Sequence, residues 1–265
     1  MDILETIIAD KKRELLLVKQ KVSIVKLERD PVFSRQTISL RDGLTGSNKG
    51  GIIAEFKRKS PSRGIIKENA DPVKISKGYV QAGANGLSVL TDTNYFAGSR
   101  GDLARVREAN QCPILRKDFM IDEYQVLESR AWGADVILLI AAVLKNDEVR
   151  NLSALAHSLG LEVLLEIHEE SELDVLNENI DIVGVNNRDL KRMVTDVNTS
   201  IDLSEKIPGD FLKISESGIS DPGTIRSLKE YGYRGFLIGE YFMEQTDPAN
   251  ACKGLIDGLQ RLEME

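Results

Sequence analysis

Ionisable and amide side chains follow apolar segments at several places along this 265-residue chain. Lysines and carboxylates are the groups with which enzymes bind charged ligands and move protons. The positions are Glu55, Lys57, Lys117, Asp118, Glu166, Asn186, Asn187, Arg188, Glu216 and Ser217. Any one of them alone could be a solvated charge or half of an ion pair. Their recurrence after successive segments favours one shared functional site.

The segments before these residues have the pattern of buried parallel strands. They recur about every 20 to 35 residues and are separated by helical patterns, which is typical of successive strand and helix units. Their interiors are almost entirely apolar, as strands covered on both faces require. The eight segments start at Gly51, Gly86, Pro113, Asp135, Glu162, Asp181, Phe211 and Gly235.

Eight such units predict an α/β fold, a single (β/α)8 TIM barrel with an extra N-terminal helix, forming one domain over residues 1–265. We expect an N-terminal extension over 1–48, with an amphipathic helix at its start and a connecting loop from Ser34 to Asn48. The barrel is expected over 49–265. Because the carboxyl ends of the strands form the active-site face of such barrels, the ionisable residues should converge there.

Capping residues predict where the helices of the barrel begin. Serine, aspartate and asparagine satisfy free N–H groups at helix starts, and proline is tolerated in the first turn. The predicted starts lie at Asp71-Pro72, Asp122-Glu123, Asn146-Asp147-Glu148, Ser171-Glu172 and Asp221-Pro222.

Two glycine-containing segments predict a phosphate site. ESGIS begins at Glu216 and LIGEYF at Leu237, after the seventh and eighth strands, where TIM barrels commonly bind phosphate. Glycines there let backbone N–H groups approach a phosphate closely, although turn glycines alone would mean little. The expected phosphate contacts are Lys57, Ser60, Ser217, Gly218 and Gly239.

Composition excludes several classes of partner. The net charge of −7 is spread along the chain without a basic stripe, so no nucleic-acid partner is expected. No signal peptide and no membrane-spanning stretch are evident, which predicts a cytoplasmic protein that does not bind a membrane. Cys112 and Cys252 lack metal-ligand spacing, so we expect two reduced, buried thiols and no metal site.

The motif GIIAEFKRKSPSRG, from Gly51 to Gly64, resembles that of indole-3-glycerol phosphate synthases of the tryptophan pathway. Similar motifs follow in order as SVLTDTNYFAGS, PILRKDF, GADVILLI, EVLLEIH, GVNNRDL, ISESGIS and FLIGE, so the resemblance covers roughly Ile3 to Met243. It implies closure of 1-(2-carboxyphenylamino)-1-deoxyribulose 5-phosphate into an indole, with loss of CO2 and water. This small molecule is the implied partner, no cofactor is implied, and protein partners stay unknown.

The resemblance also implies catalytic roles. Lys117 matches the general acid that protonates the carbonyl oxygen, and Glu166 the carboxylate that serves the dehydration. Glu55 matches a partner that orders the lysines, and Lys57 a lysine that contacts substrate. Which carboxylate moves which proton stays open at this point. Because both lysines should face one pocket, we expect each to depress the charged state of the other.

Further matches imply how the substrate is held. Asn186 and Arg188 match residues for the anthranilate carboxylate and ring, for which a guanidinium fork is suited. Glu216, Ser217, Gly218, Gly239 and Glu240 match the substrate and phosphate loops, with backbone N–H groups as the expected phosphate donors at the last three. The Glu240 carboxylate would repel phosphate unless it pointed away. An apolar pocket for the ring is expected from Phe96, Phe119, Leu138 and Met193, for which core packing is the alternative.

Other functions remain open from the sequence. A different phosphate-binding barrel, such as a phosphoribosyl anthranilate isomerase or a thiazole or triose phosphate enzyme, would share the last two loops. An isomerase of that kind relies on a cysteine and aspartate pair, whereas Cys112 precedes its strand. A barrel that has lost its chemistry and only binds a ligand is the third alternative. We expect no catalytic role for His157 or His168 and a packing role for Trp132.

Overall fold

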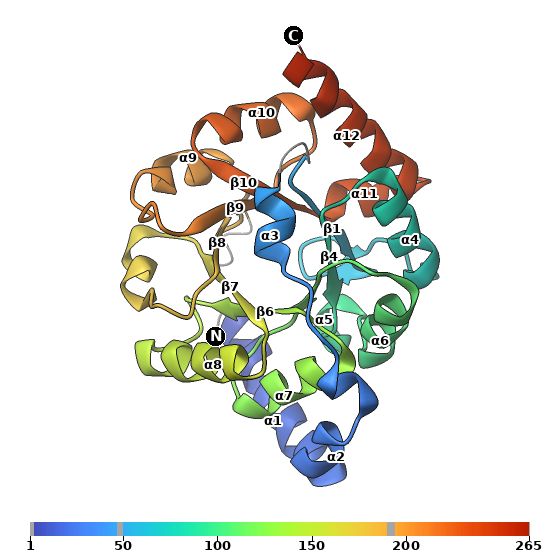
Figure 1. The fold of residues 1–265 in the computed structure, drawn as a ribbon, viewed down its shortest axis with the longest axis vertical. Helices are drawn as coiled ribbons and strands as arrows, with labels where there is room; N and C mark the ends of the chain where they lie inside the picture. The colour runs from blue at the N-terminus through green and yellow to red at the C-terminus, as the bar shows by residue number, and fades with distance from the viewer. Residues whose placement is uncertain (1–2, 47–49, 190–193, 265) are drawn as a thin grey trace.

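A computed structural model describes residues 3–46, 50–189 and 194–264. Its eight parallel strands close into a barrel in the order β1-β10-β9-β8-β7-β6-β5-β4 (Figure 1). The strands are β1 (Ile52–Phe56), β4 (Gly86–Leu90), β5 (Ile114–Lys117), β6 (Val136–Ile140), β7 (Glu162–Ile167), β8 (Ile182–Asn186), β9 (Leu212–Glu216) and β10 (Tyr233–Ile238). Each predicted segment coincides with one strand, although β10 begins at Tyr233, two residues before the predicted Gly235, so the predicted TIM barrel is confirmed. A short hairpin, β2 (Lys59–Ser60) and β3 (Gly64–Ile65), follows β1.

Helices surround the barrel and begin mostly at the predicted caps. The Asp71, Asp122 and Asp221 carboxylates each accept a backbone N–H bond at a helix start. The helices are α4 (Pro72–Ala82), α5 (Thr93–Phe96), α6 (Arg100–Ala109), α7 (Glu123–Trp132), α8 (Asn146–Ser158), α9 (Asn198–Ser204), α10 (Pro222–Glu230), α11 (Glu240–Glu244) and α12 (Pro248–Met264).

The start predicted at Ser171-Glu172 is wrong, because only a 3-10 turn, η2 (Glu170–Val175), forms there. The Glu172 carboxylate turns back to the end of β7, where it accepts the backbone N–H of His168 at 2.6 Å. It therefore does not cap a helix.

The N-terminal extension contains the predicted helix, α1 (Ile3–Lys21), followed by α2 (Ile24–Glu28) and the 3-10 turn η1 (Pro31–Ser34). The loop predicted from Ser34 to Asn48 is wrong in part, because it holds α3 (Leu40–Thr45). Ser39 caps this helix, because its Oγ accepts the Asp42 backbone N–H at 3.0 Å. Glu162, at the start of β7, adds a distant contribution, because it accepts the backbone N–H groups of Leu40 and Arg41 at 2.8 and 3.1 Å.

Helix α3 lies across one end of the barrel (Figure 1). Leu40 and Leu44 are buried there and join the apolar cluster inside the barrel, with Ile53, Leu115 and Ile214. This end carries the amino ends of the strands, so α3 covers the face opposite the predicted active site. A larger cluster packs the strands against the outer helices.

Both thiols are buried and free, as predicted. Burial raises the pKa of Cys112 to about 11 and that of Cys252 to about 12. Trp132 packs under the Arg116 guanidinium, with Cζ 3.9 Å from the ring centre, in line with its predicted packing role. Within the described residues, no helix has both the length and the apolar character needed to cross a membrane.

Candidate active site

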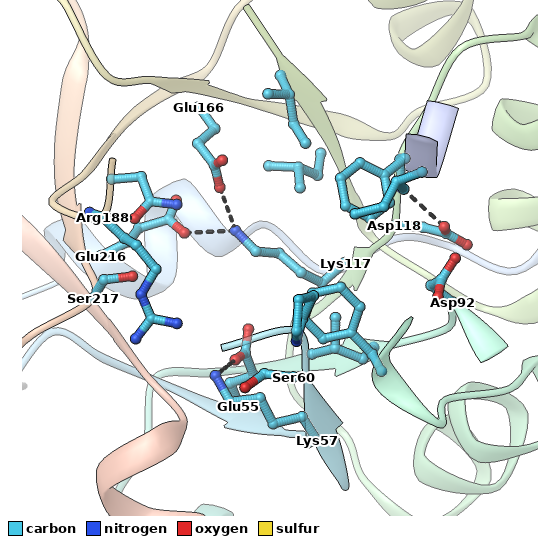
Figure 2. A pocket seen from close by; sticks show the side chains of 18 of the residues that line it. Glu55, Lys57, Ser60, Asp92, Lys117, Asp118, Glu166, Arg188, Glu216 and Ser217 are labelled. Carbon is cyan, nitrogen blue, oxygen red and sulfur yellow. Dashed lines mark hydrogen bonds and ion pairs between the residues drawn. The ribbon is translucent and has the colours of Figure 1, made fainter. Parts of the chain in front are cut away.

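A pocket of about 130 Å³ opens at the carboxyl ends of the strands (Figure 2). Ionisable groups from β1, β5, β7, β9 and their following loops face it, and apolar side chains form much of its wall. The predicted residues that line it are Glu55, Lys57, Ser60, Phe96, Lys117, Phe119, Leu138, Glu166, Asn186, Arg188, Glu216 and Ser217. The structure therefore brings the predicted catalytic and substrate-binding residues together in one place.

Lys117 lies at the centre of the charged groups. It ends β5, and its Nζ is 2.6 Å from Glu166 Oε2 on β7 and 2.6 Å from Glu216 Oε2 on β9 (Figure 2). The side chain of Lys117 is 14% exposed and those of both glutamates are almost fully buried. A buried ammonium held by two carboxylates is a fixed proton donor for a ligand that enters the pocket.

The charge states follow from this arrangement. Burial lowers the pKa of Lys117, but Glu166, Glu216 and Glu55 together outweigh it, so the pKa lies above its ordinary value. Burial raises the pKa of Glu166, but Lys117 and His168 outweigh it and bring the value to about 2. The expectation that the two lysines depress each other is therefore wrong for Lys117, because carboxylates lie closer than the second lysine does.

Glu216 is the group of this cluster that titrates near neutral pH. Burial raises its pKa from about 4.5 to about 7, against the attraction of Lys117. From about pH 4.5 to 7 the folded protein holds a proton that the unfolded chain has lost, so this group's stabilisation declines as the pH rises. We expect the free energy of unfolding of wild type, minus that of Glu216→Gln, to fall across this window in urea titrations. Parallel pH profiles of the two proteins would contradict the shift.

Glu55 contacts the second lysine. Glu55 Oε1 lies 2.8 Å from Lys57 Nζ, and Ser88 donates a hydrogen bond to Oε2 at 3.2 Å. A Cβ atom on Gly239 would lie 2.5 Å from Glu55 Oε1, so only glycine leaves room for this carboxylate. Gly239, predicted from the sequence as a phosphate-loop glycine, thus also makes room for the Glu55 carboxylate.

A second hollow of about 530 Å³ adjoins the pocket and shares Lys57, Ser62, Arg188 and Ser217 with it. Gly218, Gly239 and Glu240 line this hollow, as expected for the phosphate loops. Ser217 and Gly218 have φ of 68° and 76°, and a Cβ atom on Gly218 would lie 2.7 Å from Thr195. The turn after β9 therefore needs a glycine at 218.

Ser60 lines the pocket and is absent from the wall of the second hollow. Its Oγ accepts the backbone N–H of Arg63 at 3.2 Å, which shapes the turn between β2 and β3. Ser62 faces both spaces and was not singled out from the sequence, because nothing in the motif distinguishes its orientation from that of Ser60.

Asn186 and Arg188 lie together at the end of β8. Asn186 Oδ1 accepts the Arg188 backbone N–H at 3.0 Å. The Arg188 guanidinium reaches toward the second hollow, where it donates to Ser62 Oγ at 2.7 Å and to Glu240 Oε2 at 3.0 Å. The Glu240 carboxylate therefore faces the Arg188 guanidinium in the second hollow.

A family model described as indole-3-glycerol phosphate synthase matches residues 4–255. The chain belongs to the indole-3-glycerol phosphate synthase family. A relative of that name from Bacteroides thetaiotaomicron is 46% identical over 259 residues, which cover 98% of this chain and 99% of the relative. Another, from Bordetella pertussis, is 42% identical and covers 93% of this chain and 96% of its own length.

Solved structures of low identity share the fold of this indole-3-glycerol phosphate synthase family member. A tryptophan synthase alpha subunit from Legionella pneumophila has a TM-score of 0.61 at 13% identity and covers 84% of this chain and 95% of its own. A 3-hexulose-6-phosphate synthase from Salmonella typhimurium has a TM-score of 0.63 at 12% identity, with 80% and 99% coverage. These likenesses concern the barrel alone.

Apolar side chains from two parts of the chain, the barrel and helix α1, line the pocket. The Phe96 and Phe119 rings lie 6.3 Å apart and Leu138 lies beside them in the lining, as predicted. The first turns of α1 add Ile3, Leu4 and Ile7 to the same lining, which the sequence analysis did not place there. Their apolar spacing indicated a packed helix but not which face of the barrel it would cover. Met193 lies outside the described residues.

Lys11 on α1 is a buried charge that no sequence motif singles out. It is 3% exposed, and its Nζ lies 2.8 Å from Asp92 Oδ2 and 3.1 Å from Asp118 Oδ1. Asp118 follows Lys117 directly. The pair of contacts therefore ties α1 to the strand end that carries Lys117 and to the segment before Phe96.

His168, for which no catalytic role was expected, lies beside Glu166. Its Nε2 is 3.5 Å from Glu166 Oε1 and its Nδ1 is 3.5 Å from Glu172 Oε2. Burial lowers the pKa of His168, but Glu172, Glu166 and Glu216 outweigh it and the net shift is upward. When His168 is protonated, its positive charge lowers the pKa of Glu166. His157 lies elsewhere and pairs with Asp181 at 2.8 Å.

Proposed function

We propose that this pocket closes the ring of 1-(2-carboxyphenylamino)-1-deoxyribulose 5-phosphate to give indole-3-glycerol phosphate, CO2 and water, as an enzyme of tryptophan biosynthesis. Lys117 carries the proposal, because its Nζ is held 2.6 Å from two buried carboxylates beside an apolar wall. Family membership supports the same reaction. The substrate is a small phosphorylated molecule, and a cytoplasmic location stays a prediction.

The two adjoining spaces suit the two ends of this substrate. The aromatic ring fits the pocket walled by Phe96, Phe119 and Leu138, whose side chains offer it apolar contacts. The phosphate fits the second hollow, near Lys57 and the loops at Gly218 and Gly239. Binding at both ends fixes the carbonyl carbon against the ring carbon, which lowers the entropic cost of bond formation.

In the first step, Lys117 donates a proton to the carbonyl oxygen. A bond forms at the same time between the carbonyl carbon and the ring carbon that bears the carboxylate. Carbon dioxide then leaves from that ring carbon, and its bonding electrons restore the aromatic ring. Asn186 and Arg188 remain our proposed ligands of the substrate carboxylate, and Lys117 is a strong donor site because its positive charge is fixed before the substrate binds.

In the second step, the new hydroxyl group leaves as water. Its departure needs a proton on the oxygen and removal of a proton from the neighbouring CH2 carbon. Glu166, whose pKa is lowered to about 2, is ionised and suited to take the carbon-bound proton. Lys57 supplies a proton to the hydroxyl, and Glu55, 2.8 Å from Lys57 Nζ, orients that lysine.

The test is a direct assay of the purified protein. We expect mixing with the carboxyphenylamino-deoxyribulose phosphate, without added metal, to produce indole absorbance and fluorescence that grow with enzyme concentration. A correctly folded protein that forms no indole product would refute the proposed reaction and leave other phosphorylated substrates of the same barrel to be tried.

A further inference from the structure

The Glu240 carboxylate bridges two arginines in the second hollow. Its Oε1 accepts a hydrogen bond from Arg63 Nε at 3.0 Å, and its Oε2 accepts one from Arg188 Nη2 at 3.0 Å. The three residues come from the β2–β3 turn, the segment after β8 and the start of α11. All three line the hollow that also contains Lys57, Gly218 and Gly239. An oxyanion thus already lies between the two guanidinium groups.

Ion pairs with two glutamates hold the Arg63 side chain at the second hollow. The Arg63 side chain is 57% exposed, and its guanidinium contacts Glu240 and, at 3.7 Å, Glu244. Burial raises the pKa of Glu240, but Arg188, Arg63 and Lys57 outweigh it, so this carboxylate stays ionised. A guanidinium fork binds phosphate oxygens with the same geometry as carboxylate oxygens. Arg63 can therefore exchange one oxyanion for the other with little movement.

We propose that Arg63 is a further ligand of the substrate phosphate, and that the Glu240 carboxylate holds Arg63 and Arg188 together until the phosphate replaces it at Arg63, which frees the Arg188 guanidinium for the substrate carboxylate. This proposal rests on the proposed function, in which the substrate phosphate occupies the second hollow.

The exchange has a consequence for selectivity. A phosphate ester carries about 1.5 to 2 negative charges at neutral pH, whereas Glu240 carries one. A dianionic ligand gains attraction over the carboxylate that it displaces, and a monoanionic ligand gains none. Glu240 therefore lowers the affinity of every anion that must displace it by a similar factor, and phosphate, with its higher charge, keeps the stronger attraction to the guanidinium group.

Binding of inorganic phosphate, measured by titration calorimetry, tests the proposal without reference to turnover. We expect Glu240→Gln to tighten the Kd for phosphate about threefold to tenfold, because the competing charge is lost while the shape is kept. Arg63→Gln should weaken it by a similar factor, since a charge-assisted contact is lost. The matched control is Glu263→Gln, which removes a carboxylate paired with Lys229 on the outer helices, away from the hollow, and should leave the Kd within about twofold.

The results distinguish displacement of Glu240 by phosphate from a purely structural role of Glu240. If Glu240 only positioned the two arginines, Glu240→Gln would weaken phosphate binding, and this result would overturn the proposal. An unchanged Kd in Arg63→Gln would also overturn it. In the full reaction, Arg63→Gln should raise KM with little change in kcat, and Arg63→Lys should restore part of the affinity.

The same measurements distinguish this proposal from the proposed function. If the protein forms no indole product but phosphate affinity follows the expected order across the variants, the ring-closing reaction fails and the exchange at Glu240 stands. If product forms but neither Glu240→Gln nor Arg63→Gln changes phosphate affinity, the reaction stands and the exchange fails.

Discussion

Replacing Lys117 with methionine is expected to lower kcat at least about 100-fold while KM stays within about tenfold. Methionine keeps the length and much of the volume of the side chain but has no proton to donate. The carbonyl oxygen would then develop negative charge without a donor, which raises the barrier to ring closure. Steady-state kinetics with the carboxyphenylamino-deoxyribulose phosphate measure both constants.

The control for this variant is Lys253→Met. Lys253 also forms a 2.6 Å ion pair, with Asp257, but it lies exposed on α12 outside the barrel. We expect this variant to keep wild-type kcat and KM. Circular dichroism should show that Lys117→Met is folded, because its glutamates can take up a proton when the lysine is lost. Turnover near the wild-type rate in a folded Lys117→Met protein would remove Lys117 from the proton transfer.

The barrel and the convergence of its strand-end residues could be predicted because both depend on local patterns. Strands buried on both faces must be apolar, so GIIAEF or DVILLI is recognisable without knowledge of its neighbours. Once eight parallel strands are assigned, barrel closure places all their carboxyl ends on one face. Lys117, Glu166 and Glu216 therefore meet although they lie on different strands.

Contacts between distant segments could not be predicted in the same way. The sequence around Lys11 does not indicate that Asp92 and Asp118 will enclose its ammonium group. The bridge from Arg63 to Arg188 through Glu240 likewise depends on how three separate segments pack. In both cases the charged partners lie in segments that are distant in sequence, and only the fold brings them together.

Two errors have the same physical origin. Residues 40–45 looked like loop because Gly43 and Gly46 weaken a short helical pattern, yet Glu162, 122 residues away from Leu40, supplements the local Ser39 cap by accepting two backbone N–H groups at the start of α3. The pKa of Lys117 lies above its ordinary value because Glu166, Glu216 and Glu55 outweigh the effect of burial. Burial and the distances to these carboxylates are both set by tertiary structure, which the sequence alone does not show.

The amino end of the barrel offers the largest expected effect on stability. Asp135, just before β6, is fully buried and accepts four hydrogen bonds. Its Oδ1 accepts from Arg35 Nη2 at 2.7 Å and from the Ile38 backbone at 2.8 Å, and its Oδ2 from Arg107 Nη1 at 2.8 Å and the Ile114 backbone at 2.9 Å. This carboxylate joins the N-terminal extension to two units of the barrel.

Asp135→Ala should lower the free energy of unfolding by about 3–5 kcal/mol, because it leaves the buried Arg107 guanidinium without its carboxylate. Urea titration measures this change. Asp257→Ala, which breaks the exposed pair with Lys253, should change stability by less than about 1 kcal/mol. If Asp135→Ala also lowered the free energy of unfolding by less than about 1 kcal/mol, other contacts would be holding Arg107 and the N-terminal extension in place. Because Asp135 and Lys117 lie at opposite ends of the barrel, folded Asp135→Ala should retain kcat, which would separate stability from catalysis.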